Sequence, residues 1–261
     1  MAASDYGHTS VVEMLVEAGA KVNIQDKIGI SPLMCAARNG HKDTAILLLD
    51  HKAEMNLLDK NGWTALTLAT QNGRDEVVSV LMTRGADVNK EQDNGLTPLM
   101  FASKNSQTIL VSKLLDIGAN INGQNKDGKT ALQIASETAN NAGVVSLLLE
   151  RGAAPNHVDK DGKSALCAGT KSGSEEIVSM LLENGALVNL QSERGSTALM
   201  RAAENGHIGL ISLLLSKNAD INVRNHKGQS ALDLAEARGQ KKAVELLKAK
   251  GAKPRRKFFF F

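Results

Sequence analysis

Residues 123–130 read GQNKDGKT and match the P-loop pattern G-x-x-x-x-G-K-[ST] letter for letter. In a working P-loop, backbone N–H groups between a buried parallel strand and a following helix bind the phosphates of a nucleotide. The triplet GKS at 162–164 repeats the end of the pattern without the upstream glycine. The motif makes nucleotide hydrolysis a candidate activity. Whether it indicates that activity depends on the secondary structure around it.

Histidine and cysteine are the other residue types here that suit catalysis or metal binding. His41 and His207 each follow a glycine in the same local context, which indicates a structural hydrogen bond. The other four histidines fall at turns or helix ends without metal-ligand spacing: His8, His51, His157 and His226. Cys35 and Cys167 are too few for a disulfide framework, which favours an intracellular setting and packing as small hydrophobes.

A period of 33 residues explains the P-loop match. The recurring glycines are Gly29, Gly62, Gly95, Gly128, Gly162, Gly195 and Gly228. Each is followed two residues later by a serine or threonine and four residues later by a leucine. Gly128 is therefore a turn glycine and Thr130 a helix cap, each with an equivalent in every repeat. Such a period predicts a stacked-repeat solenoid, and we expect no catalytic, cofactor-binding or metal-binding residues and no enzyme activity.

The repeat at 59–91 shows how one unit is built. Gly62 lies in a turn that favours positive φ, and Thr64 is placed to cap a short first helix. Two other repeats carry Pro32 or Pro98 directly after the cap, a position that accepts proline. The first helix is predicted to end near residues 72–73.

The second helix of this repeat follows from its apolar spacing. Val77, Val78, Leu81 and Met82 form one apolar stripe, and the glycine at 85 predicts a left-handed C-cap. The asparagine that follows recurs in seven repeats and predicts side-chain-to-backbone hydrogen bonds that close the connection: Asn23, Asn56, Asn89, Asn122, Asn156, Asn189 and Asn222.

The strings NGLTPLMFAS (94–103) and RGADVNKE (84–91) resemble the ankyrin repeat. The resemblance covers residues 1–252 and implies an all-α repeat solenoid, an ankyrin-type stack of about eight helix-turn-helix repeats with β-hairpin-like turns. The expected repeats are 1–25 (incomplete), 26–58, 59–91, 92–124, 125–158, 159–191, 192–224 and the cap-like 225–252, followed by a basic and phenylalanine-rich tail at 253–261.

The chain begins in register with the inside of a first helix, which predicts a fragment of a longer array. Val11, Val12, Leu15 and Val16 of this repeat remain apolar, whereas the second helix of the last repeat is polar. Two alternatives to a plain binding module therefore stay open. The first is a self-assembling structural repeat protein (dimer or filament), and the second is the recognition region of a larger enzyme or receptor.

Composition limits the partners. Only 3% of residues are aromatic while 42% are hydrophobic, which is typical of helices packed by small aliphatic side chains. The net charge is +3, but twelve basic residues face four acidic ones from Lys217 onward, which reads as a solvated end. No apolar run approaches the length of a membrane helix, and the tail KPRRKFFFF is the only expected membrane contact. We predict a cytoplasmic or nuclear protein, monomeric rather than self-associating, that takes neither a small-molecule substrate nor nucleic acid.

The resemblance implies that a partner binds the concave face made by the turns and first helices. The residues that follow the turn glycines, with one neighbour, form the predicted centre: Ile28, Ile30, Trp63, Leu96, Lys129 and Lys163. Predicted polar contacts around them are Arg38, Asn39, Gln71, Asn72, Lys104 and Asn105. This set fits a protein or peptide with apolar anchors followed by acidic residues. The alternative is that the apolar tips pack against their own repeats.

Overall fold

The computed structural model describes residues 1–254, which divide into two compact units, Met1–Lys126 and a second unit that begins at Asp127. Every regular element in residues 1–254 is an α-helix, so the predicted all-helical class is confirmed, and the hairpin-like turns contain no strand in this range.

The helices of the first unit are α1 (Ala2–Asp5), α2 (Thr9–Glu17), α3 (Pro32–Asn39), α4 (Lys42–Asp50), α5 (Ala65–Gln71), α6 (Asp75–Thr83), α7 (Pro98–Lys104) and α8 (Thr108–Asp116). Those of the second unit are α9 (Ala131–Ser136), α10 (Ala142–Glu150), α11 (Ala165–Ser172), α12 (Glu175–Glu183), α13 (Ala198–Asn205), α14 (Ile208–Ser216), α15 (Ala231–Ala237) and α16 (Lys241–Ala249).

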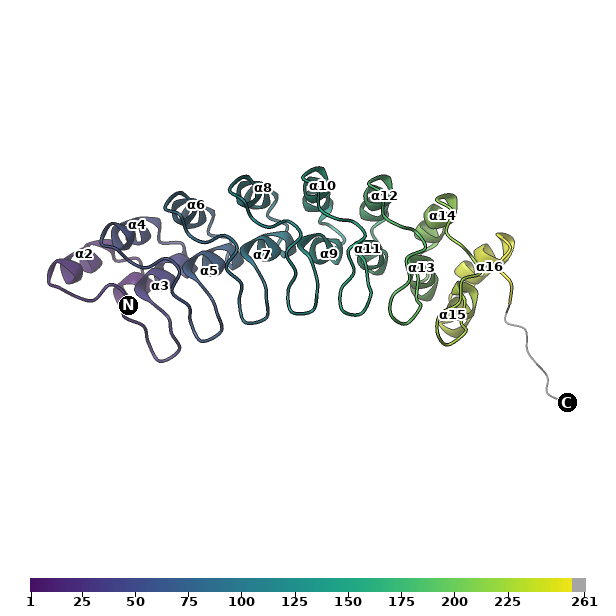
Figure 1. The fold of residues 1–261 in the computed structure, drawn as a ribbon, viewed down its shortest axis with the longest axis horizontal. Helices are drawn as coiled ribbons and strands as arrows, with labels where there is room; N and C mark the ends of the chain where they lie inside the picture. The colour runs from purple at the N-terminus through teal and green to yellow at the C-terminus, as the bar shows by residue number, and fades with distance from the viewer. Residues whose placement is uncertain (255–261) are drawn as a thin grey trace. The chain divides into compact units, whose positions relative to one another are not determined.

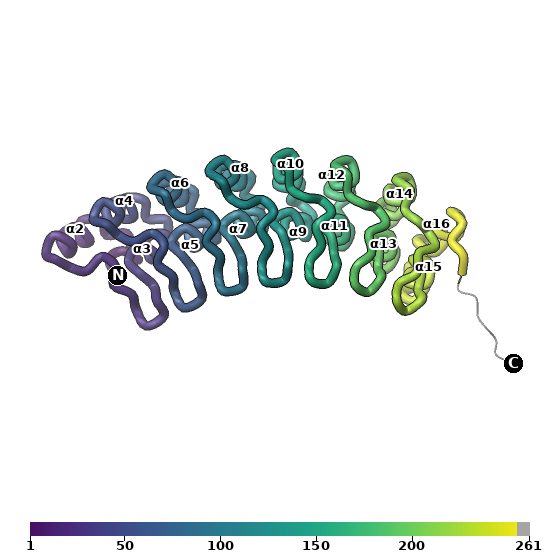
Figure 2. The backbone as a smooth tube through the Cα atoms, viewed as in Figure 1, coloured from purple at the N-terminus to yellow at the C-terminus, as the bar shows by residue number. Residues whose placement is uncertain are grey.

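Each unit is a stack of helix pairs in two layers (Figures 1 and 2). Within the first unit, α3 packs on α5 and α5 on α7, while α2 packs on α4 and α4 on α6. Within the second unit, α9, α11, α13 and α15 make the first-helix layer, and α10, α12, α14 and α16 make the other. The hairpin turns project beside the first helices in both units. The side chains of turns and first helices therefore share one face of each unit, called here the turn-and-inner-helix face.

Side-chain capping fixes the start of the first helices. The Thr64 hydroxyl accepts the backbone N–H of Thr67 at 3.1 Å, and its φ of −99° is extended. The same cap occurs on α3, α7, α9, α11, α13 and α15. Pro32 and Pro98 occupy the first helical turn, as predicted. A lost cap of this kind typically costs about 1 kcal/mol.

The turn glycine serves two purposes, as Gly62 shows. Its φ is +77°, a region that favours glycine. A Cβ at this position would also lie 2.8 Å from the backbone nitrogen of Asp93 in the next turn. Consecutive turns approach this closely because they hydrogen-bond to each other: the N–H of Lys60 donates to the carbonyl of Ile28 at 3.0 Å. The glycine thus sets the spacing of neighbouring repeats as well as the shape of its own turn.

The recurrent asparagines also join neighbouring repeats. Asn89 donates from Nδ2 to the carbonyl of Gly118 at 3.1 Å, and its Oδ1 accepts the N–H of Asn120 at 2.8 Å. Asn156 makes the equivalent pair of bonds in the second unit. The predicted side-chain-to-backbone bonding is confirmed, and its partner lies one repeat downstream.

Candidate functional site

The predicted apolar tips lie in the first unit, and most of them are not free. Ile30 is only 7% exposed, so the prediction that it points outward is wrong. Trp63 is half-buried and packs its ring on Phe101 of α7, with ring centroids 5.1 Å apart. Leu96 is also half-buried, whereas Ile28 is 57% exposed. The backbone directs the residue after the turn glycine back over the inner helices, where apolar side chains gain more by packing than by exposure.

Arg38 and Asn39 hold the first repeat in place. The guanidinium of Arg38 donates to a carboxylate oxygen of Asp5 at 2.8 Å, and Asn39 Nδ2 reaches the same oxygen at 2.7 Å. Asp5 ends α1, so both residues link α1 to α3. Their polar groups are engaged within the fold, which lowers their value as partner contacts.

The remaining predicted polar residues of the first unit are exposed. Asn72 donates to the carbonyl of Leu68 at 2.8 Å, and Asn105 donates to the carbonyl of Gln71 at 3.1 Å. The side chains of Gln71 and Lys104 make no hydrogen bond or ion pair with other residues of the range 1–254. These two remain the freest polar groups that the sequence pointed to in this unit.

Lys129 and Lys163 lie on the turn-and-inner-helix face of the second unit, and both ammonium groups are paired. Lys129 bonds to Glu137 at 2.5 Å, and Lys163 bonds to Asp161 at 2.5 Å. Burial lowers the pKa of Lys129, but the hydrogen bond and charge of Glu137 outweigh it and raise the pKa overall. Lys129 therefore stays charged at neutral pH.

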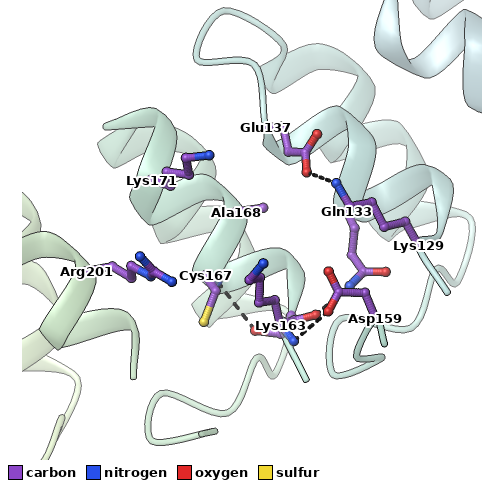
Figure 3. Close-up of a pocket in the computed structure, with 10 residues that line it drawn as sticks. Lys129, Gln133, Glu137, Asp159, Lys163, Cys167, Ala168, Lys171 and Arg201 are labelled. Carbon is purple, nitrogen blue, oxygen red and sulfur yellow. Dashed lines mark hydrogen bonds and ion pairs between the residues drawn. The ribbon is translucent and has the colours of Figure 1, made fainter. Parts of the chain in front are cut away.

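These two lysines border a cavity of about 150 Å³ (Figure 3). Its walls come from the α9, α11 and α13 repeats and consist of Lys129, Gln133, Glu137, Asp159, Lys163, Ser164, Cys167, Ala168, Lys171 and Arg201. Figure 3 shows Ala168 at the centre, with the longer side chains around it.

Ala168 is the shortest side chain that lines the cavity. The fourth residue after the helix cap is larger in every other repeat with a full first helix: Cys35, Leu68, Phe101, Ile134, Arg201 and Leu234. Where Phe101 fills this place in the first unit, it supports Trp63. At residue 168 the place is left open. This difference is visible in the sequence, because alanine occurs at a position where the other repeats have larger residues.

Sequence reasoning missed two cations of the cavity, Lys171 and Arg201. Lys171 makes no ion pair or hydrogen bond within the described part of the chain. Arg201 makes a long contact of 3.4 Å with Glu204, whose carboxylate is also held by Arg238 at 2.8 Å. Both cations are therefore available to an incoming anion.

The other polar groups of the cavity are used by the fold. Asp159 is 9% exposed, and its Oδ1 accepts the backbone N–H groups of Asp161 and Lys163. Gln133 donates to the carbonyl of Lys163 at 2.6 Å. Burial raises the pKa of the Cys167 thiol, so it remains protonated at neutral pH and is a poor nucleophile.

The residues of the P-loop look-alike have repeat roles. Gly128 has a φ of +78°, as the other turn glycines do, and the hydroxyl of Thr130 caps α9. Within residues 1–254, no cluster of three or more His, Cys, Asp or Glu has metal-binding geometry. The same residues contain no helix long and apolar enough to cross a membrane. Most of the 253–261 tail, on which a membrane contact was predicted, lies outside the described residues.

Comparison with known proteins agrees with the repeat architecture. The family profile described as "Ankyrin repeats (3 copies)" matches residues 1–92, 85–159 and 171–257. A search of curated proteins found no match. The matched residues cover most of the chain but leave out residues 160–170, which include Lys163, Cys167 and Ala168 of the cavity. Ankyrin repeats are in general non-catalytic protein–protein interaction modules. The chain belongs to the ankyrin repeat family.

Proposed function

We propose that this protein is a non-catalytic binding module that holds a protein or peptide partner on its turn-and-inner-helix face. The proposal rests on one observation: the outward-facing residues differ between repeats, whereas the residues that build the fold hardly change. The seventh residue after each helix cap points away from the core and reads Arg38, Gln71, Lys104, Glu137, Lys171, Glu204 and Ala237. Caps, turn glycines and core leucines hardly change, because the fold requires them. Because the fold does not constrain the outward-facing residues, they can differ to suit a partner, as a recognition surface requires.

The basic part of this face favours an acidic segment of the partner. Four cations border the cavity in the second unit, against the two carboxylates of Glu137 and Asp159. In the first unit, exposed Ile28 offers an apolar contact. We also infer a cytoplasmic or nuclear setting, which the two free, buried cysteines support.

Charge reversal tests the proposed face. Partners captured from cytosolic extract are identified by mass spectrometry and purified, and their dissociation constants are measured by calorimetry. Gln71→Glu, Lys104→Glu and Lys171→Glu should each weaken binding without changing thermal unfolding. Lys242→Glu, on exposed α16 in the other layer, is the matched control. If the control loses binding while the three variants keep it, the partner binds elsewhere and the proposal fails.

Self-association is the second candidate function, because α2 exposes apolar side chains. Met14 and Leu15 are exposed, and Leu15 borders an open apolar groove beside Val12 and Ile24. Light scattering against protein concentration measures the oligomeric state. A mass that rises with concentration and falls back in Leu15→Glu would support this candidate. A constant monomer mass would eliminate it.

A further inference from the structure

The cavity around Ala168 has the features of a receptor for a single anionic group. Ala168 leaves space at a position where the preceding repeat has Ile134, and cationic side chains of three consecutive repeats border that space. A larger side chain at residue 168 would therefore occupy this space without altering the charges around it.

The cations divide into engaged and available groups. Lys129 and Lys163 already bond to Glu137 and Asp161. The Lys163 pair is largely exposed to solvent, so it contributes little energy and is easily exchanged. Lys171 has no anionic partner among residues 1–254, and Arg201 has only a long contact to its own helix. Lys171 and Arg201 should make the first contacts with an anion.

The charge balance distinguishes between classes of anion. Four cations and two carboxylates border the cavity, and the flanking carboxylates of Asp161 and Glu204 pair with Lys163 and Arg201. An incoming anion must compete with these carboxylates. A phosphate monoester carries about −1.5 to −2 at neutral pH and has three acceptor oxygens, so it competes better than a single carboxylate does. The guanidinium of Arg201 suits a two-point contact with such oxygens, and an ammonium such as that of Lys171 can take a third.

At the floor of the cavity, Asp159 is the group whose negative charge opposes an anion. The buried Cys167 thiol is neutral at neutral pH. The Asp159 carboxylate accepts hydrogen bonds from two backbone N–H groups of its own hairpin turn, those of Lys163 at 2.8 Å and Asp161 at 3.0 Å.

We propose that the cavity binds the phosphoryl group of a phosphorylated serine or threonine on the protein partner. The inference rests on the proposed function, because the partner must lie along the turn-and-inner-helix face to deliver the group. It makes binding dependent on phosphorylation of the partner.

The test is a titration of the purified chain with O-phospho-L-serine, followed by the NMR signal of a ¹³C-labelled Ala168 methyl group. We expect a saturable shift with phosphoserine and a weaker one with L-glutamate. Lys171→Ala and Arg201→Ala should each reduce the affinity about tenfold, as expected for loss of one charged hydrogen bond. Lys242→Ala, on the exposed surface of α16 in the other layer, should leave it unchanged.

A second variant keeps the test independent of charge. Ala168→Ile gives the α11 repeat the side chain that the α9 repeat already has, so it should fold and fill the cavity. In this variant the titration is followed by the backbone amide of Lys171, and the shift seen for that amide in the parent chain should vanish. Thermal unfolding of each variant verifies the fold.

Several outcomes overturn the proposal: no saturable shift, glutamate binding as tightly as phosphoserine, or unchanged binding in Ala168→Ile. Inorganic phosphate that binds more tightly than phosphoserine would indicate a free-phosphate site and would also overturn it. Because this titration contains no partner, its failure is distinct from a failure of the capture experiment. A partner that binds without phosphorylation would leave the proposed function standing and remove this inference alone.

Discussion

Leu15 and Leu81 occupy the same register position in the second helices of different repeats, which allows a controlled test of the packing. Leu81 of α6 is fully buried, whereas Leu15 of α2 is 47% exposed. Each is the seventh residue of its helix, so substitution by alanine changes intrinsic helix propensity equally in both. The difference between the two variants therefore measures the covering of the side chain by other repeats.

The expected costs follow from the exposure. Leu→Ala removes apolar surface worth about 2.4 kcal/mol for a fully buried side chain, at about 0.8 kcal/mol per methylene. The cavity left in a closed core brings the total for Leu81 to about 3–5 kcal/mol. Leu15 loses roughly half of the transfer term, about 1 kcal/mol, and leaves no enclosed cavity.

The assay is urea-induced unfolding followed by circular dichroism at low protein concentration. Both variants should unfold with unchanged slope, and the midpoint of the Leu81→Ala variant should fall much further. Equal losses for the two variants would refute the reasoning, because they would mean that the α2 face is as well covered in solution as the α6 face.

Three further predictions concern local chemistry. Burial opposes ionisation of Asp233, but hydrogen bonds from Ser230 and the charge of Arg224 outweigh it and lower the pKa. The stabilisation is present above the unfolded-state pKa and is lost as pH falls through the folded one, so Asp233→Asn should destabilise at neutral pH and match the parent chain well below about pH 4 in acid unfolding curves. Lys52 has a φ of +64°, so Lys52→Gly should raise the free energy of unfolding by about 0.5–1 kcal/mol in urea titrations, and a lower midpoint would contradict this. Burial, assisted by the charge of a nearby aspartate, raises the pKa of Cys35 from 9.0 to about 11. The native protein should therefore resist modification by iodoacetamide at neutral pH. Its free energy of unfolding should decline as pH rises from 9 to 11, and Cys35→Ala should reduce that decline.

The sequence was a sufficient guide wherever one backbone geometry recurs. The cap at Thr64, the turn at Gly62 and the bridge at Asn89 each follow from a residue type with few conformational alternatives. Because these residues recur with the period, the helix pairs and their stacking could be predicted from the chain alone.

Side-chain direction at the turns could not be predicted in this way. Ile30 and Trp63 follow turn glycines, as Lys129 does, yet the apolar side chains turn inward over the next inner helix. That choice depends on a residue one repeat away, such as Phe101 beneath Trp63. Arg38 was likewise predicted as a partner contact, but Asp5, in a different repeat, engages it. Contacts between repeats cannot be predicted when the sequence is analysed one repeat at a time.

Ala168 connects stability with recognition. A closed cavity in a core costs about 24 cal/mol per Å³, but this one opens among charged side chains where water can enter, so its cost is smaller. Ala168→Ile adds apolar contact at a place where neighbouring repeats accept large side chains, and the thermal midpoint should rise or stay constant. The same change removes the space proposed for the phosphoryl group. A variant that is at least as stable but no longer binds phosphoserine would show that the short residue is kept for recognition, a common form of stability–function trade-off. If the variant instead loses stability, the space at residue 168 is required by the packing of α11, and the alanine needs no functional explanation.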